Sequence, residues 1–464
     1  MKKILIYSTI GLMLVSCKKS FTELAPVSQR SVQTSYKTQA DFTVAVSGAY
    51  DALQLNGTYG RIYLLMNEMR SDNVANGAGA SGVAATLEDI DRHREITTAT
   101  EVSGCWTDSY KGIARCNIIL DRIDAATFPD ALKKQFKGEA LFIRSLLYYN
   151  LAVLFGNIPL QLHDVNSPSE ITINQVNAAK VYEQIIADLT LAETLVPAKY
   201  TGADLGRVSS GAVNSLLGKV YLTAGNKTAA ATALRKVINS NNYSLVTDYA
   251  RLWGGANENG PESIFEVQFK SGGQGEGSGY FEYFASVLGR SGGAGGGNSQ
   301  MSITNDIVAA YASGDLRYGK SIYRNNRVPD TSYVTKYITT QTTAFDGENN
   351  WVVLRYADVV LMLAEALGET NESYDLINAV RVRTGLASIS SATPGTFAEK
   401  LLAERRVEFA FENQRWQDLL RFGVARLVMS KHLNIPEASV RLVFPIPQKE
   451  IDVSNGKIVQ NAGF

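Results

Sequence analysis

The chain has 464 residues, and its 45 basic and 45 acidic side chains give a formal net charge of zero. Neither sign forms a long run, which argues against a nucleic-acid binder, because such proteins carry a basic stripe. With 45% hydrophobic residues the chain can build a large core. Its 22 tyrosines outnumber the other aromatic residues, and tyrosine tolerates a half-wet surface, so we expect some of these rings to face a ligand.

The first residues have the three parts of a secretory signal. Lys2 and Lys3 give the charged start, residues 4–15 are mostly apolar, and the small Ser16 precedes a candidate cleavage point. The apolar run is too short to span a bilayer as a helix, which takes about 20 residues. The sequence Leu-Val-Ser-Cys resembles a bacterial lipobox, so we predict a signal peptide over residues 1–16 and acylation of Cys17. The alternative is an ordinary signal peptide with an incidental cysteine.

Residues 17–40 are then expected to form a lipidated N-terminus and a polar tether. Two or more acyl chains hold a protein firmly at a membrane, whereas one chain does not. Nothing later in the sequence resembles a membrane span. The sequence therefore predicts a folded body on a lipid anchor.

Helical periodicity dominates from residue 41 to residue 156, where apolar residues recur at spacings of three and four. A glycine-rich segment over residues 74–89 interrupts it and is expected to be a loop. Cys105 and Cys116 fall on one predicted helix, about 16 Å apart along its axis, which is beyond the reach of a disulfide. Both are expected to be small buried residues.

A second helical region contains a candidate repeat. Residues 211–245 read as two antiparallel helices with a turn at Gly225 and Asn226. The tetratricopeptide pattern, with Asn in place of Trp, fits Asn214, Leu217, Gly218, Tyr221, Ala230 and Leu234. A generic helical hairpin is the alternative.

Residues 250–350 change character and become rich in Gly, Asn, Ser and Tyr, with strand-like pieces at 263–269 and 332–338. Helical patterns return over 352–370, 373–385 and 397–423. The remaining tail is irregular and contains several prolines. The chain is therefore expected to be mainly α.

Two glycine motifs and three histidines carry no chemistry in this context. G-x-G-x-x-G at residues 77–82 lacks the strand that a dinucleotide site needs, and G-x-S-x-G at 289–293 lacks a strand-to-helix turn. The histidines are too far apart in sequence to pair on a metal, and no cluster of Cys or carboxylates completes a site. We expect no metal and no cofactor.

The densest charge cluster is "ERRVEFAFENQRWQDLLR", in which Glu404, Glu408 and Glu412 repeat every four residues along one helical face. Paired carboxylates could serve glycoside hydrolysis, so a degenerate glycosidase is one hypothesis. An arginine is available for each acid, however, and large apolar residues share the helix. A paired, partly buried ion network is the favoured interpretation, and we expect no enzymatic activity.

Several segments of the sequence, in their order along the chain, resemble the SusD/RagB family of outer-membrane lipoproteins of Bacteroidota. The matching segments are "EALFIRSLLYYNLAVLFGNIPL", "GRVSSGAVNSLLGKVYLTAGN", "SGDLRYGKSIY", "VLRYADVVLMLAEALGE", "INAVRVRTGL", "ERRVEFAFENQRWQDLLR" and "FPIP" with the closing "QNAGF". They run over nearly the whole mature chain.

The resemblance implies a single SusD-like α-rich domain over residues 41–464. Tetratricopeptide-like helix pairs are expected at about 139–240 and 352–423, and a loop-rich insertion at about 250–350 with a few short strands on the ligand face. It also implies a nutrient ligand, most simply a glycan, and a SusC-like TonB-dependent transporter in the same membrane as partner. The alternatives are a peptide-binding RagB-like lid and an envelope scaffold whose helical repeats hold other proteins.

The shared segments are mostly scaffold, so ligand-binding candidates come from the loops. Aromatic rings stack on apolar sugar faces beside hydrogen-bonding side chains. The candidates are Asp72, Asn73, Arg92, His93, Tyr280, Phe281, Tyr283 and Trp351. The family implies a lipid-anchored protein of the outer membrane that faces the cell surface, although Lys18 and Lys19 stand where surface-displayed relatives often carry acidic residues.

Overall fold

The computed structural model describes residues 36–77, 83–284, 300–324, 332–338 and 343–464. The predicted signal peptide, Cys17 and most of the predicted tether lie outside the described residues. So do residues 78–82 of the first glycine motif and the whole of the second, at 289–293.

The described chain is mainly helical, as the periodicity predicts, and its strands are only two or five residues long. The helices of the first half are α1 Gln39–Asp51, α2 Ile62–Met69, α3 Val83–Asp91, α4 Thr100–Arg122, α5 Asp130–Phe155, α6 Ala178–Glu193, α7 Ser210–Thr223 and α8 Lys227–Asn239. Those of the second half are α9 Tyr280–Phe284, α10 Asn305–Ala310, α11 Tyr318–Ser321, α12 Tyr356–Leu367, α13 Asn371–Val382, α14 Phe397–Glu408, α15 Arg415–Arg421, α16 Ala425–Leu433 and α17 Gln448–Val453.

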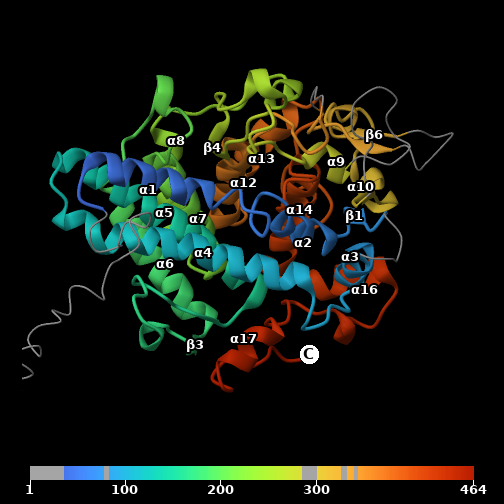
Figure 1. Ribbon diagram of the computed structural model, residues 1–464. Coiled ribbons are helices and arrows are strands. Elements are labelled where there is room, and N and C mark those ends of the chain that lie inside the picture. Colours follow the sequence, from blue (N-terminus) through green and yellow to red (C-terminus); the bar gives the residue numbers. More distant parts are fainter. Residues whose placement is uncertain (1–35, 78–82, 285–299, 325–331, 339–342) are drawn as a thin grey trace, which may run out of the picture.

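The strands form small antiparallel pairs. They are β1 Val74–Ala75 with β5 Ser302–Ile303, β2 Ile158–Pro159 with β3 Gln175–Val176, β4 Ser263–Val267 with β8 Trp351–Arg355, and β6 Ile322–Tyr323 with β7 Tyr333–Val334. In Figure 1 the long helices α1 and α4–α8 fill one side of the molecule, and α9, α10, β1 and β6 gather at the other. The pairs β1–β5 and β6–β7 lie on the loop-rich side, whereas β2 contacts α5 and the β4–β8 pair contacts α7.

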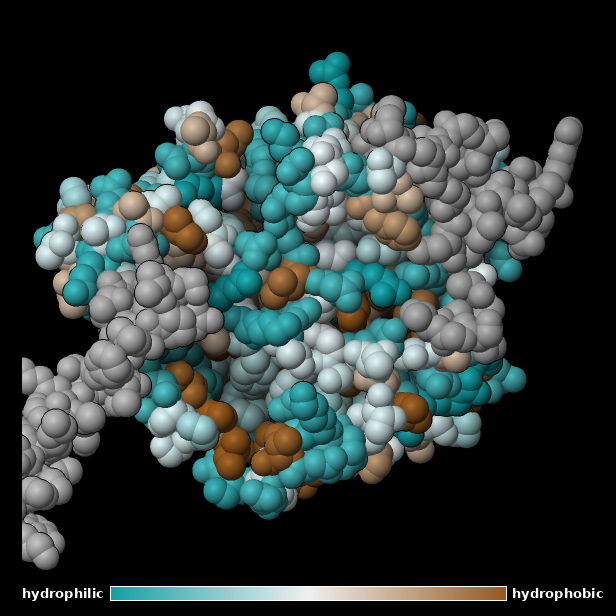
Figure 2. Space-filling view, in the orientation of Figure 1, coloured by the Kyte–Doolittle hydropathy of each residue, from teal (hydrophilic) through white to brown (hydrophobic). Residues whose placement is uncertain are grey.

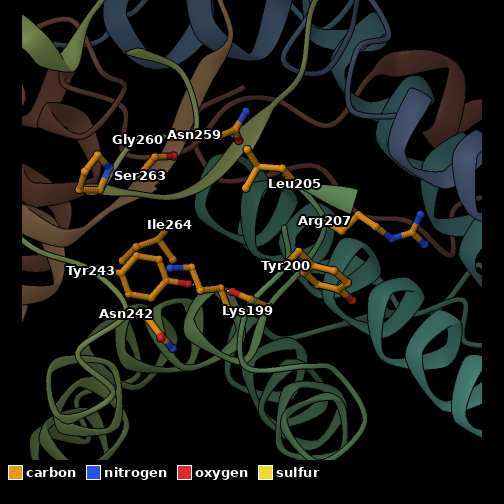
Figure 3. Close-up of a pocket in the computed structure, with 13 residues that line it drawn as sticks. Lys199, Tyr200, Leu205, Arg207, Asn242, Tyr243, Asn259, Gly260, Ser263 and Ile264 are labelled. Carbon is orange, nitrogen blue, oxygen red and sulfur yellow. Dashed lines mark hydrogen bonds between the residues drawn. The ribbon is translucent and has the colours of Figure 1, made fainter. Parts of the chain in front are cut away.

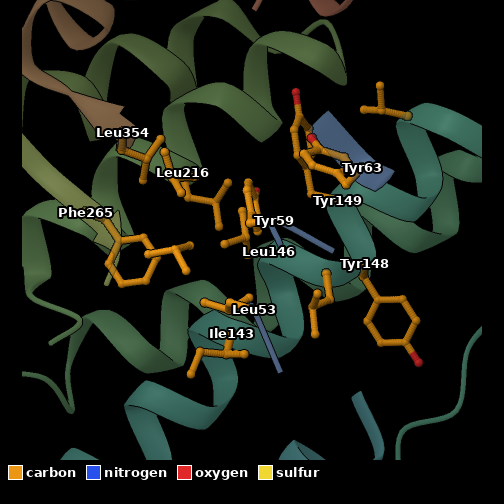
Figure 4. Packing of buried hydrophobic residues seen from close by; sticks show 14 of the residues in the cluster. Leu53, Tyr59, Tyr63, Ile143, Leu146, Tyr148, Tyr149, Leu216, Phe265 and Leu354 are labelled. Atoms are coloured by element: carbon orange, nitrogen blue, oxygen red, sulfur yellow. The ribbon is translucent and has the colours of Figure 1, made fainter. Parts of the chain in front are cut away.

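Helix α5 is the centre of the scaffold. It packs against α4 and α6, and Figure 4 shows Tyr149 beside Tyr63 of the first half of the chain, with Phe265 and Leu354 of the second half across the cluster from them. The helix is long and apolar enough to cross a membrane, but its apolar window is entirely buried inside the fold. Buried Arg144 in this helix donates to Asp188 of α6 at 2.9 Å. Burial on all sides and an internal ion pair are typical of a core helix.

The α7–α8 hairpin confirms the predicted antiparallel pair. Gly225 turns the chain with a φ of 80°, and the Asn226 side chain caps α8 by accepting from the Ala229 N–H at 3.1 Å. Gly218 of α7 faces Leu234 of α8, and a Cβ atom on Gly218 would lie 2.4 Å from Leu234 Cδ2. The missing side chain therefore lets the two helices approach closely.

Two local predictions can be compared directly with the fold. Cys105 and Cys116 are both buried and free, which confirms that prediction. The glycine-rich segment 74–89 was expected to be a loop throughout, which is wrong, because α3 begins at Val83. The alanine and leucine residues after Gly82 give a helical face that can be buried, and Leu87 is fully buried in the core.

Charge and apolar surface are well mixed on the outside. Figure 2 shows hydrophobic residues in small separate groups among hydrophilic ones on the face in view. The protein therefore presents no broad apolar area on that face.

Gly218 gives a direct test of the hairpin packing. Gly218→Ala should lower the free energy of unfolding by about 1–3 kcal/mol, because the new methyl group overlaps buried Leu234. Gly48→Ala in α1 is the matched control, since a Cβ atom there meets nothing within 4 Å and should stabilise the helix by about 0.5–1 kcal/mol. Urea unfolding of the three proteins checks this, and equal losses in both variants would contradict the packing argument.

Candidate functional site

The loop-rich side brings together segments that are far apart in the sequence. Strand β5 pairs with β1 and contacts β7, and β7 in turn pairs with β6 and contacts α9. We call the surface formed by residues 302–324, 332–338 and 343–350 the loop face. It lies at the upper right of Figure 1 around α9, α10 and β6.

A pair of stacked tyrosines lies on the loop face. Tyr323 of β6 and Tyr333 of β7 are register partners, and their ring centroids are 4.8 Å apart with an interplanar angle of 24°. Tyr323 is 45% exposed, whereas the neighbouring Ile322 and Val334 point into the core. The alternation of a two-stranded ribbon thus holds an aromatic pair at the surface. We refer to Tyr323 and Tyr333 as the tyrosine pair.

A polar pair follows the tyrosine pair in sequence. Arg324, the residue after Tyr323, is exposed and donates through Nη2 to Asn305 Oδ1 at 2.9 Å. Asn305 begins α10, whose preceding residue Thr304 caps the helix and also donates to the Asp72 carbonyl oxygen at 2.8 Å. An aromatic surface with a guanidinium and an amide beside it can bind a ring that has an apolar face and hydroxyl groups at its edge.

Phe345 adds a second exposed ring. It is 47% exposed and has a φ of 59°, a left-handed conformation that is rare for a bulky residue. Its N–H donates to Glu282 Oε1 at 3.1 Å, and its ring lies 5.8 Å from that of Tyr283. Strained backbone that exposes a large ring is often found at binding sites, and Phe345 is therefore a further candidate.

The four aromatic candidates from the sequence lie beneath this surface and not on it. Tyr280, Phe281 and Trp351 are at most 3% exposed, and Tyr283 is 6% exposed. The Trp351 ring stacks on Tyr337 at 5.1 Å, and the Tyr280 hydroxyl donates to the Tyr59 carbonyl oxygen at 2.8 Å. The expectation that these rings line an open loop surface is wrong for this structure, because they form the aromatic layer that supports the loop face.

Asp72 and Asn73 are also structural in this arrangement. Arg415 and Arg406 pair with the Asp72 carboxylate at 2.7 and 2.9 Å, and Arg406 Nε donates to Asn73 Oδ1 at 2.9 Å. Burial opposes ionisation of Asp72, but Arg415 and Arg406 hold its pKa below the usual value. Both residues are buried, so neither offers its side chain to an outside ligand.

Arg92 and His93 follow α3 and lie away from the tyrosine pair. The Arg92 side chain is exposed and pairs with Glu88, whereas His93 is buried with Nδ1 3.0 Å from the Arg441 carbonyl oxygen. Burial, and to a smaller extent nearby Arg70, lower the pKa of His93 to about 3, so the imidazole is neutral at physiological pH. The structure does not bring these two residues together with the other candidates.

The residues that sequence reasoning missed are Tyr323, Tyr333 and Phe345. The segments "SIYRN" and "TSYVTKY" both place a tyrosine beside β-branched residues, which is the available signal for a half-buried strand. Which strand pairs with which cannot be read from such short segments, and the stacking of the two rings depends on that pairing.

The acid cluster forms the predicted ion network. Glu408 accepts from Arg317, Arg355 and Arg383 at 2.9, 2.7 and 2.5 Å, and all four side chains are almost fully buried. Glu404 pairs with Arg317 and Arg381, and Glu412 with Arg355 and Lys336. Every acid of the cluster is therefore satisfied by cations of the fold.

The electrostatics of this network disfavour acid catalysis. Burial alone would raise the pKa of Glu408, but the guanidinium groups of Arg383, Arg355 and Arg317 hold it well below its usual value. A general acid needs a raised pKa and access to a substrate, and Glu408 has neither. Among the described residues no group of three or more His, Cys, Asp or Glu side chains could hold a metal ion.

A small cavity of about 330 Å³ lies between the α7–α8 hairpin and β4. Figure 3 shows Tyr243 and Lys199 turned toward one another in it, with Tyr200 and Arg207 on the far side. Its polar groups are largely engaged within the protein, since Tyr243 bonds Ser209 at 2.9 Å and Arg207 pairs with Glu139 at 2.8 Å. This cavity offers fewer free groups than the loop face.

Comparisons with known proteins identify the relatives of this chain. Residues 28–222 match a SusD-like family described as "Starch-binding associating with outer membrane", and residues 316–464 match the SusD family. A SusD-like protein of Formosa agariphila is 27% identical over 98% of this chain and 98% of its own length. The two family matches lie in the order expected for one SusD-like protein.

Solved structures share the fold. A laminarin-binding SusD-like protein is 29% identical, with a TM-score of 0.81 over 92% of this chain and all of that one. A surface glycan-binding protein from Bacteroides thetaiotaomicron, solved with laminarihexaose, is 22% identical with a TM-score of 0.79 over 92% of this chain and 100% of that one. The latter likeness establishes the fold alone.

Glu408 provides a test of the ion network. Glu408→Gln should lower the free energy of unfolding by about 3–5 kcal/mol, because it leaves buried guanidinium groups without their shared carboxylate. Glu183→Gln is the control, since Glu183 is 62% exposed and should change stability little. Denaturant unfolding at neutral pH measures both.

The loss of stability in Glu408→Gln should depend on pH in a defined direction. Folding lowers the pKa of Glu408, so its carboxylate contributes fully to the free energy of unfolding above the unfolded-state pKa of about 4.3. This contribution is lost as the pH falls toward the pKa of the folded state. The stability difference between the native protein and Glu408→Gln should therefore narrow below about pH 4. A difference that grows with acidification would contradict this account.

Proposed function

This chain belongs to the SusD/RagB family, and we propose on that basis that it captures a glycan at the outer membrane without cleaving it. The observation that carries the proposal is the stacked tyrosine pair, in which Tyr323 is exposed and Tyr333 is half-buried, with the exposed Arg324 next in sequence. Aromatic rings bind the apolar faces of sugars, and neighbouring polar groups fix the hydroxyls.

The name of one solved relative supports a glycan as the ligand. The SusD-like protein that is 29% identical is named for laminarin binding. Laminarin is a neutral glucan, and the tyrosine pair suits a neutral ring better than a charged one. A soluble glucan is therefore the first ligand to test on the loop face.

Absence of catalysis is part of the proposal. The two solved structures reported above carry names of binding proteins. The acids of the glycosidase hypothesis are held as buried ion pairs, which supports a structural role. The protein would then bind the ligand and pass it on without forming or breaking a covalent bond in it.

The anchor and the partner complete the proposed function. Residues 1–16 would be removed as a signal peptide, Cys17 would carry the lipid, and residues 17–40 would tether the domain of residues 41–464. The ligand would pass to a SusC-like TonB-dependent transporter in the same membrane, with this protein facing the cell surface. The family description that names association with the outer membrane supports this location.

The binding experiments also test two other functions. A peptide-binding lid would use the same loop face for a peptide, and an envelope scaffold would bind proteins through its helix pairs and no small ligand. Peptide ligands that displace a glucan, or partners captured without any glucan binding, would favour one of these.

The tyrosine pair gives the test of glycan capture. Tyr323→Ala should weaken binding of laminarin oligosaccharides about tenfold, because the exposed stacking surface is lost. Tyr323→Phe keeps the ring and should retain most of the affinity. Isothermal titration calorimetry with a melting curve for each variant checks this, and equal affinity of the native protein and a folded Tyr323→Ala would contradict the assignment of the site.

Cys17 gives the test of the anchor. The full-length protein expressed in a Bacteroidota host should incorporate an alkyne-labelled fatty acid and sediment with membranes, whereas Cys17→Ser should do neither. Cys105→Ser is the control, because Cys105 is buried in α4 and should leave both results unchanged. Label that persists in Cys17→Ser would contradict lipidation at this residue.

A further inference from the structure

A cavity of about 750 Å³ lies between the segment after α3, helix α16 and the C-terminal segment. We call it the arginine cavity. Helices α3 and α16 appear near one another at the lower right of Figure 1. Its volume is within the usual range for small-molecule sites, about 300–1,000 Å³.

The wall of this cavity is strongly cationic. Arg92, Arg94, Arg426 and Arg441 line it, and none of the described residues that line it is Asp or Glu. The carboxylates that pair with three of these arginines, Glu88, Asp89 and Glu95, do not line the cavity, so the charged groups that line it are all cationic. Clefts lined by one sign of charge raise the local concentration of an oppositely charged ligand.

Three of the four arginines have a carboxylate partner outside the lining of the cavity, and two of these arginines are also exposed to solvent. Arg92 pairs with Glu88, and Arg94 lies 3.4 Å from Asp89, with side chains 54% and 57% exposed. Glu95 is shared, since it pairs with Arg70 at 2.5 Å and lies 3.6 Å from Arg441.

Arg426 has no carboxylate partner among the described residues. Its Nη1 donates to the carbonyl oxygens of Glu437 and Val440 at 3.0 and 2.9 Å, which leaves the other N–H groups of the guanidinium for a ligand. Carbonyl oxygens orient the group but do not neutralise it. A fixed guanidinium is well suited to bind an oxyanion.

His93 holds two of these arginines in place. Its backbone φ is 54°, and its backbone N–H donates to the Ile90 carbonyl oxygen at 3.2 Å. The centroid of its ring lies 5.5 Å from that of the Trp416 ring. The buried imidazole ring fixes the backbone at His93, and the side chains of the adjacent Arg92 and Arg94 are exposed. His93 is therefore a positioning residue for the cavity wall.

The remaining wall is apolar. Leu433, Ile435, Leu442 and Val443 line the cavity together with Ser439. Aliphatic side chains can cover the C–H face of a sugar ring while guanidinium groups bind its charged substituent. A ligand with both features fits this wall better than a free inorganic ion.

We propose that the arginine cavity is a second ligand site, which binds the oxyanion group, a sulfate ester or a carboxylate, of an acidic saccharide. This site rests on the proposed function in taking a saccharide as the carrier of the charge. It is separate from the tyrosine pair and extends the protein's ligands from neutral to acidic glycans.

The test uses the folded protein with a sulfated oligosaccharide, its desulfated form, oligogalacturonate and sodium sulfate as separate probes. Arg94→Gln and Arg426→Gln should each weaken binding of the acidic oligosaccharides about tenfold, as expected when a charge-assisted hydrogen bond is lost. Arg251→Gln is the matched control, because Arg251 is 77% exposed and lies outside the cavity. Binding of the acidic probes should also weaken with added NaCl.

The outcomes separate this site from the tyrosine pair. Laminarin affinity should be unchanged in Arg94→Gln and Arg426→Gln, and affinity for the acidic probes should be unchanged in Tyr323→Ala. Failure of laminarin binding with intact binding of acidic probes would contradict the neutral-glucan assignment alone. The proposal is overturned if no acidic oligosaccharide binds, if folded Arg94→Gln and Arg426→Gln bind it as the native protein does, or if sodium sulfate binds as tightly as the sulfated oligosaccharide.

Discussion

The shared carboxylate of Glu408 is the interaction on which the arrangement of this protein depends. Its two oxygens accept from Arg317, Arg355 and Arg383, which come from three separate segments of the second half of the chain. Arg355 ends β8 just before α12, and Arg383 follows α13. Because a buried charge without a partner is very costly, these segments can pack only when all the pairs form together. The network thus selects one docking of the helices.

The same network positions the ligand surface. Lys336, just after β7, pairs with Glu412 at 2.6 Å, and the Tyr337 hydroxyl donates to the Phe411 carbonyl oxygen at 2.7 Å. These bonds attach the segment that contains β7 and Tyr333 to the residues that follow α14. The buried rings of Tyr280 and Trp351 then fill the space under the loop face. Rigid support of this kind is what a binding surface needs, since a preorganised site loses less conformational entropy when the ligand binds.

The sequence predicted the scaffold well and the ligand surface poorly, and the reason is physical. Helical spacing, Gly218 opposite Leu234 and the arginines beside Glu404, Glu408 and Glu412 are local patterns, and each led to the correct element or pair. Tyr280 and Trp351 were placed on the surface because they lie in or beside a glycine-rich segment, yet both are buried, and their rings pack on each other although they are far apart in sequence. The exposure of Tyr323 depends on the pairing of two two-residue strands, and no short pattern encodes that pairing.

The account makes one central claim, that the protein binds an intact glycan on a rigid helical scaffold. The most direct measurement is a calorimetric titration of residues 18–464 against a panel of oligosaccharides and peptides, with mass spectrometry of each recovered ligand. The account predicts a binding signal for at least one glycan and an unchanged mass after recovery. A cleaved ligand would contradict the absence of catalysis, and a panel in which only peptides or nothing bound would contradict glycan capture.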